Sequence, residues 1–118
     1  MNLAELFQHE TDLKSVPAGQ PLFKEGEQGD LMFVLMSGIA AIIVNKRVVE
    51  TATAGAIVGE MAMIDDESRS ATVVAKSDCR FFPIERNRFN FLVQQTPNFA
   101  IHVMRVIADR LRKTDAML

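Results

Sequence analysis

Two residues of opposite charge, Glu60 and Arg69, lie nine positions apart in a segment that also contains glycine and serine. The planar guanidinium of an arginine has N–H donors in a fork that suits two oxygens of a phosphate. A phosphate would repel Glu60, but this carboxylate is a good acceptor for a sugar hydroxyl next to a phosphate. Ser70 adds a hydroxyl and a backbone N–H directly after the arginine. Together these residue types predict a site for a sugar phosphate.

The backbone before Arg69 favours the same chemistry. Gly59 is expected to end a strand and to let the main chain approach a ligand closely. The run from Glu60 to Met63 consists of helix formers. The first N–H groups of such a short helix have no partner within the helix, so they can face an anion.

This segment resembles the phosphate-binding cassette of the cyclic nucleotide-binding domain family. The cassette reads Gly-Glu-x-Ala/Gly-x, a short spacer, and then Arg-Ser/Thr/Ala-Ala-Thr/Trp-Val. Here the corresponding residues are Gly59-Glu60-Met61-Ala62-Met63 and Arg69-Ser70-Ala71-Thr72-Val73. An isolated Glu–Arg pair with this spacing would be interpreted as a structural ion pair. The full cassette favours a binding site instead.

The resemblance covers about residues 10–115. Residues 23–38 look like the glycine-punctuated strand pair of the family, and Gly55 precedes the cassette at the expected offset. From Arg69 to about Thr114 the sequence is similar, without gaps, to the ligand domain and long C-terminal helix of bacterial cAMP receptor proteins.

The resemblance implies a role for each matching residue. Glu60 would accept the ribose 2′-hydroxyl, and Arg69 would pair with the cyclic phosphate. Backbone N–H groups and the Ser70 hydroxyl would complete the phosphate cradle, and Arg110 and Thr114 would face the nucleotide, with Thr114 at the adenine amino group. The expected cradle residues are Gly59, Glu60, Met61, Ala62, Arg69, Ser70 and Ala71, and the expected residues around the base are Ile42, Val49, Arg110 and Thr114.

Two departures from the family pattern affect this site. Ser68 stands where many family members have proline just before the arginine, so the loop is less restricted. Asp65-Asp66-Glu67 also places three carboxylates close to a proposed anion site. If they point outward they have little effect. If they point inward they weaken phosphate binding or pair with Arg69.

The elements that must position these residues are mainly strands. Short runs rich in Val, Ile, Phe and Thr are separated by Gly and Pro, and Asn45-Lys46 is expected to form a tight hairpin turn. Strands are expected near residues 13–16, 21–24, 31–37, 39–44, 47–53, 56–58, 71–75 and 79–84. Many short strands at regular spacing indicate an eight-stranded jelly-roll β-barrel (a double-stranded β-helix).

Helical periodicity appears at both ends of the chain. Residues 1–10 are expected to form a short helix with Leu3, Leu6 and Phe7 on one side. Residues 86–95 are expected to form a second helix, and Thr96-Pro97 a start signal for a third. The apolar residues of the third helix cover roughly 200° of its circumference, so part of it needs a ligand, a second subunit or the preceding helix.

These elements predict one mainly β domain over residues 1–118. It comprises an N-terminal helix (1–10), a jelly roll (12–85) that contains the cassette (58–73), and C-terminal helices (86–118). The chain stops at Leu118, so we expect no helix-turn-helix domain.

Composition excludes several classes of function. The net charge of −2 argues against a domain that binds nucleic acid by itself or an anionic membrane. No segment resembles a signal peptide or is long enough to span a bilayer, and the single cysteine, Cys79, fits a reducing cytoplasm. His9 and His102 both lie outside the strand region, so neither a metal site nor a cupin-type enzyme is expected.

The sequence therefore predicts a cytoplasmic, non-enzymatic sensor without a metal or cofactor. Its ligand would be cAMP, in preference to cGMP, and binding would be coupled to the position of the C-terminal helix. That helix could bind a second copy of the chain or a separate effector. The alternative is the same fold with a vestigial pocket, acting as a protein–protein interaction module.

Overall fold

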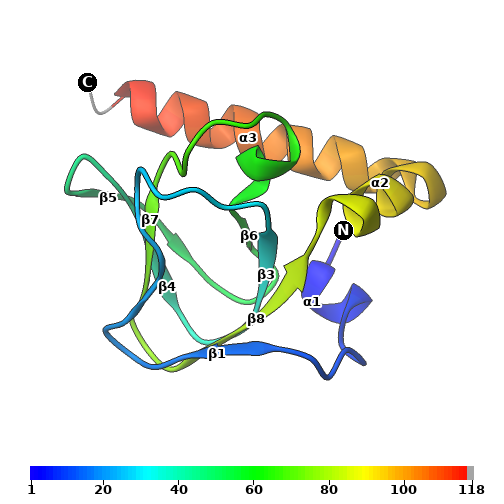
Figure 1. Ribbon diagram of the computed structural model, residues 1–118, viewed down its shortest axis with the longest axis horizontal. Helices are drawn as coiled ribbons and strands as arrows, with labels where there is room; N and C mark the ends of the chain where they lie inside the picture. The colour runs from blue at the N-terminus through cyan, green and yellow to red at the C-terminus, as the bar shows by residue number, and fades with distance from the viewer. Residues whose placement is uncertain (117–118) are drawn as a thin grey trace.

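Eight short strands, three α-helices and one 3₁₀ helix make up the computed structural model, which describes residues 1–116 (Figure 1). Every strand lies within two residues of its expected bounds, because glycine, proline and asparagine mark the turns. The strands are β1 (Lys14–Val16), β2 (Pro21–Phe23), β3 (Met32–Ser37), β4 (Ala40–Val44), β5 (Arg47–Ala52), β6 (Ile57–Val58), β7 (Thr72–Ala75) and β8 (Cys79–Ile84).

The strands form two antiparallel sheets of four, with the orders β1-β8-β3-β6 and β2-β7-β4-β5. Non-consecutive strands are neighbours in both sheets, as expected for the predicted jelly roll. In β3, Phe33 and Leu35 pack in one apolar cluster, while Met32 and Val34 pack in another together with residues of the helices. The first sheet is therefore covered on both faces, which explains the unbroken apolar run in β3.

The β4–β5 hairpin turns at Asn45-Lys46, as predicted. Asn45 has φ 51° and Lys46 has φ 66°, the left-handed values that a two-residue hairpin turn requires. This turn brings Glu50 on β5 opposite Ile42 on β4. Strand β5 pairs only with β4 and is the edge strand of its sheet.

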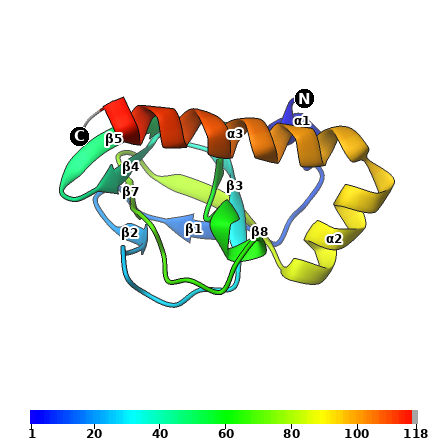
Figure 2. The same ribbon diagram turned by 90° about the horizontal axis from the view of Figure 1, so that it is seen from above.

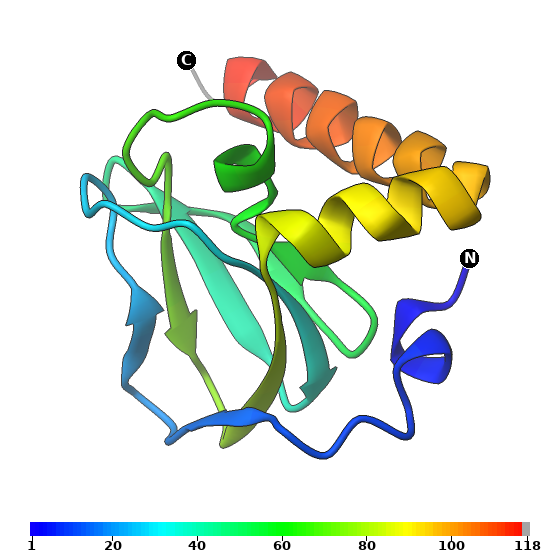
Figure 3. The same cartoon turned by 45° about the vertical axis from the view of Figure 1, so that its right-hand side comes forward.

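Two C-terminal helices cover one side of the strands (Figures 2 and 3). Helix α2 (Arg86–Gln95) has the predicted bounds, and α3 (Pro97–Ala116) begins at the predicted proline. The Phe89 and Phe99 rings meet edge to face with centroids 5.7 Å apart, which fixes α2 against α3. The last two residues of the predicted range 86–118 lie outside the described part of the chain.

The N-terminal helix is much shorter than predicted. Helix α1 spans only Leu3–Leu6, and Phe7 already leaves the helical conformation. Leu3 and Phe7 are buried and the Phe7 ring packs 4.8 Å from that of Phe82, but Leu6 is 48% exposed. The predicted helix over residues 1–10 therefore forms only one turn, and Leu6 does not share the buried side of Leu3 and Phe7 as predicted.

Candidate functional site

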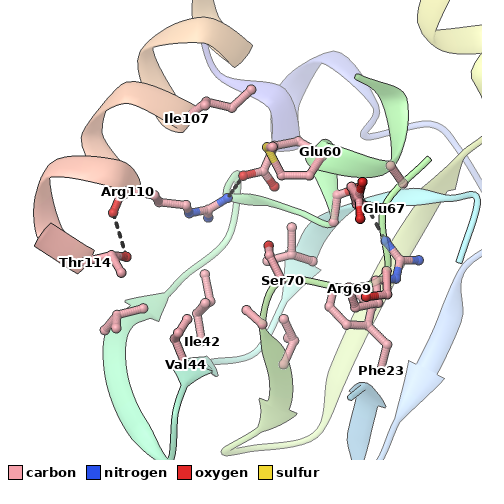
Figure 4. A pocket seen from close by; sticks show the side chains of 18 of the residues that line it. Phe23, Ile42, Val44, Glu60, Glu67, Arg69, Ser70, Ile107, Arg110 and Thr114 are labelled. Carbon is pink, nitrogen blue, oxygen red and sulfur yellow. Dashed lines mark hydrogen bonds and ion pairs between the residues drawn. The ribbon is translucent and has the colours of Figure 1, made fainter. Parts of the chain in front are cut away.

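All eleven residues predicted for the site line one cavity of about 350 Å³. The cavity lies between the second sheet, the segment after β6 and the C-terminal end of α3 (Figure 4). Its walls are mostly apolar, with a few charged and polar side chains, which is the usual character of a small-molecule site. The sequence analysis discussed Glu67, Ser68 and Val73 but did not assign them to the site, and it also left out the other lining residues, namely Phe23, Val44, Val58, Ile107 and Leu111.

Gly59 positions the first half of the cassette. It has φ 73° between β6 and the 3₁₀ helix η1 (Glu60–Met63), and a Cβ on it would lie 2.7 Å from Arg69 Nη1. A side chain at this position would thus be strained and would displace the arginine. The turn buries the Glu60 side chain, of which 7% is exposed.

One expected cradle group is already used by the protein. The N–H of Ala62 donates to the carbonyl of Gly59 at 3.2 Å, within the turn that forms η1. This N–H is therefore engaged within the turn in this structure, and its expected contact with an anion stays a prediction. The N–H of Met61 lies in the first turn of η1, where no carbonyl of the helix can reach it.

Arg69 has a confined guanidinium without an acidic partner. The group stacks over the Phe23 ring at 4.1 Å from its centroid, and Nη1 donates to Gly59 O at a long 3.4 Å. The Nε is buried and has no hydrogen-bond partner, and no carboxylate in residues 1–116 lies within 4.0 Å of the guanidinium. Burial lowers the pKa of Arg69, and the more distant Asp30, Glu27 and Glu60 offset only part of this effect. Most of its donors are therefore available for an anion.

The acidic loop does not neutralise Arg69. Asp65 accepts a hydrogen bond from the Glu67 N–H at 3.1 Å, and Asp66 is fully exposed and 3.7 Å from Arg86 on α2. Glu67 lines the cavity but is also exposed. Of the two alternatives for this loop, the structure supports the outward one for Asp66 and excludes an ion pair with Arg69.

Arg110 differs sharply from Arg69. It reaches from α3 toward η1, where Nη1 donates to Glu60 Oε1 at 2.8 Å (Figure 4). Its Nε and Nη2 donate to the two oxygens of Glu50 at 3.2 and 3.1 Å, and Nη2 also donates to the carbonyl of Ile57. Burial alone would lower the pKa of Arg110, but the carboxylates of Glu60 and Glu50 more than compensate and raise it.

Thr114 lies one turn further along α3. Its hydroxyl donates to the carbonyl of Arg110 at 2.9 Å, which leaves the oxygen lone pairs free. Thr114 and Arg110 both line the cavity, as predicted. The sequence analysis missed Glu50. Its partner, Arg110, lies sixty residues away, so no local sequence pattern indicates that Glu50 belongs to the site.

The comparison with known proteins identifies this architecture. A family profile described as Cyclic nucleotide-binding domain matches residues 13–96. The chain belongs to the cyclic nucleotide-binding domain family. The matched range contains both halves of the predicted cassette and all eight strands.

Relatives within this family differ in what surrounds the domain. The Cyclic AMP receptor protein of Thermus thermophilus is 28% identical over 107 residues, which are 86% of this chain and 50% of that protein. A cGMP-dependent protein kinase of Plasmodium berghei is 30% identical over 100 residues, 85% of this chain and 12% of the kinase. This chain thus spans half or less of these curated relatives.

A solved structure named cAMP-bound PfPKA-R has the same fold. It superposes with a TM-score of 0.83 at 24% identity and covers 98% of this chain and 44% of that one. Within residues 1–116, no helix is long and apolar enough to cross a bilayer. The same residues contain no cluster of three or more His, Cys, Asp or Glu side chains that could hold a metal ion.

Proposed function

We propose that the protein binds a cyclic nucleotide reversibly and without catalysis, and that it prefers cAMP to cGMP. The observation that carries this proposal is the Arg69 guanidinium, which borders the cavity with a buried, unpartnered Nε and no carboxylate within 4.0 Å in residues 1–116. A half-buried guanidinium with a buried, unpartnered Nε is costly, and a phosphate would satisfy it with charge-assisted hydrogen bonds.

The rest of the cavity suits the other parts of such a ligand. Glu60 uses Oε1 for Arg110, so its second carboxylate oxygen can accept a ribose hydroxyl. The N–H groups of Met61 and Ser70 would add donors for the phosphate. Ile42 and Val49 offer apolar surface for a purine. The names of the Thermus thermophilus relative and of PfPKA-R connect both to cAMP, which supports this class of ligand.

Thr114 supports a preference for adenine. Because its hydroxyl proton is donated to the Arg110 carbonyl, the oxygen presents lone pairs to the cavity. Lone pairs accept a hydrogen bond from the exocyclic amino group of adenine, whereas guanine has a carbonyl oxygen at that position. The Plasmodium berghei relative is named for cGMP, so the base preference must be measured directly.

We also propose that binding is coupled to the position of α3. A nucleotide that contacts Glu60 and Thr114 would favour the conformation in which Arg110 and Thr114 stay at the cavity. The outer side of α3 exposes Ile101 and Met104, which could bind a second copy or a separate effector in the cytoplasm.

Calorimetric titration with cAMP and then cGMP tests the proposal. We expect saturable binding that is tighter for cAMP, and a loss of at least about a hundredfold in Arg69→Ala, because a charge-assisted phosphate contact is removed. Arg80→Ala, which removes an exposed arginine of β8 outside the cavity, is the matched control and should bind like the wild type.

Retention of wild-type affinity by Arg69→Ala would contradict the proposed phosphate contact. Absence of binding of either nucleotide to the wild type, with no thermal stabilisation at millimolar ligand, would leave the interaction module as the better interpretation.

A further inference from the structure

We infer that Glu50 is a positioning residue that holds the end of α3 over the cavity through Arg110. The mechanical part of this inference stands on contacts within the protein. Its consequence for ligand binding rests on the proposed function.

Glu50 accepts hydrogen bonds from Arg110 through both of its carboxylate oxygens. Oε1 accepts from Nε at 3.2 Å and Oε2 accepts from Nη2 at 3.1 Å, the paired geometry that orients a guanidinium most firmly. Only 18% of the Glu50 side chain and 14% of the Arg110 side chain are exposed. This ion pair is therefore shielded from water and salt far better than a surface pair.

The donors of Arg110 are nearly exhausted by the protein. A guanidinium has five N–H donors. Nε donates to Glu50, Nη2 donates to Glu50 and to the carbonyl of Ile57, and Nη1 donates to Glu60, so four of the five are engaged. Arg110 thus lacks two free donors on one edge for a phosphate. Arg69, with its single long hydrogen bond, has them.

Glu50 also contacts the next turn of α3. Lys113 Nζ lies 3.7 Å from Glu50 Oε1 and 3.1 Å from Asp109 Oδ2. Lys113 is about half exposed, so its contact with Glu50 contributes little compared with that of Arg110. Strand β5 is the edge strand of its sheet. Glu50 therefore connects this edge to α3, the helix that closes the cavity.

Amide hydrogen exchange of Glu50→Gln tests the mechanical part without any nucleotide. Glutamine keeps the size of the side chain but removes the charge, and a hydrogen bond to a charged group is worth about tenfold to hundredfold in a local equilibrium. We expect exchange in residues 107–116 to accelerate by about tenfold or more, with unchanged exchange in β3 and β8. Lys113→Gln is the control and should leave both regions close to wild type.

A double-mutant cycle separates this role from a general loss of stability. If Glu50 acts through Arg110, then Glu50→Gln combined with Arg110→Gln should accelerate exchange in α3 no more than Arg110→Gln alone. Fully additive effects, or unchanged exchange in Glu50→Gln, would overturn the inference whatever the protein binds.

Stopped-flow release of cAMP tests the consequence for the ligand. We expect about tenfold faster release from Glu50→Gln. If the end of α3 is held less firmly over the cavity, the dissociation rate of the ligand should change more than its association rate. Unchanged release in spite of faster exchange would show that α3 does not retain the nucleotide. If the wild type binds no cyclic nucleotide, the proposed function fails, and the exchange experiment still decides the role of Glu50.

Discussion

Arg69 lies in a slot that three neighbouring residues shape. The Phe23 ring forms one wall at 4.1 Å from the guanidinium carbon, and the backbones of Gly29 and Gly59 approach it closely enough that a Cβ on either would lie within 2.7 Å of its nitrogens. Stacking on an aromatic ring stabilises the cation without occupying its N–H donors. The slot therefore holds Arg69 in place and still leaves its donors available.

Substitution of Gly29 tests the slot. A Cβ at this position would lie 2.4 Å from Nε and Nη2 of Arg69, so Gly29→Ala must displace the guanidinium. We expect cAMP affinity to fall about tenfold or more, as for loss of a hydrogen bond to a charged group, with the fold retained. Calorimetric titration measures this, with the adjacent, exposed Gln28→Ala as control. Equal affinity of Gly29→Ala and wild type would mean that the slot does not position Arg69.

Helix α3 combines three functions along one element. Its first half buries Phe99 and Val103 against α2 and the first sheet, and its last turns bring Arg110 and Thr114 to the cavity. The side away from the strands exposes Ile101 and Met104. An apolar surface wider than a core-facing stripe is therefore divided between the core and a surface open to a partner.

His102 on α3 makes stability depend on pH. Burial, together with the positive Met1 amino group and Arg105, lowers the pKa of His102 below its ordinary value of 6.5. The unfolded chain thus binds a proton at a higher pH than the folded chain does, so the free energy of unfolding decreases as pH falls below about 6.5. We expect a smaller decrease in His102→Gln, measured by urea unfolding between about pH 7 and pH 5.5. The exposed His9→Gln is the control, and identical pH profiles of wild type and His102→Gln would refute this role.

At the scale of the whole molecule, the cavity lies where the second sheet, η1 and α3 meet. The second sheet, η1 and α3 each contribute lining residues (Figure 4). From α3, Arg110 bonds to the second sheet through Glu50, to β6 of the first sheet through Ile57, and to η1 through Glu60. A ligand in this cavity would contact segments far apart in sequence. It should therefore stabilise the folded protein and not one element alone.

Thermal unfolding measures this global effect. A ligand present at a hundred times its dissociation constant adds about 2.7 kcal/mol to the free energy of unfolding. For a chain of 118 residues this corresponds to a rise in Tm of roughly 10 °C. We expect cAMP to produce this shift in the wild type and not in Arg69→Ala. An equal shift in both proteins would indicate that the nucleotide binds somewhere else.

Most strand bounds and the cassette could be predicted because the information for them is local. Turn residues such as Asn45 and Lys46 adopt left-handed backbone conformations, and apolar runs between turns form strands wherever the chain packs. Arg69 and Glu60 could be identified from residue types within one short segment. The family resemblance added the expectation that Arg110 and Thr114 lie at the same cavity, and the structure places both there.

Only the tertiary structure decided how these residues are partnered. Glu50 and Arg110 are sixty residues apart, and no local pattern relates a strand carboxylate to a late helical arginine. Helix α1 is likewise shorter than the ten residues that the local pattern predicted, and Phe7, just after its end, packs against Phe82 from β8. Local periodicity determines which elements form, whereas contacts between distant elements determine where a helix stops and which of two arginines keeps its donors free.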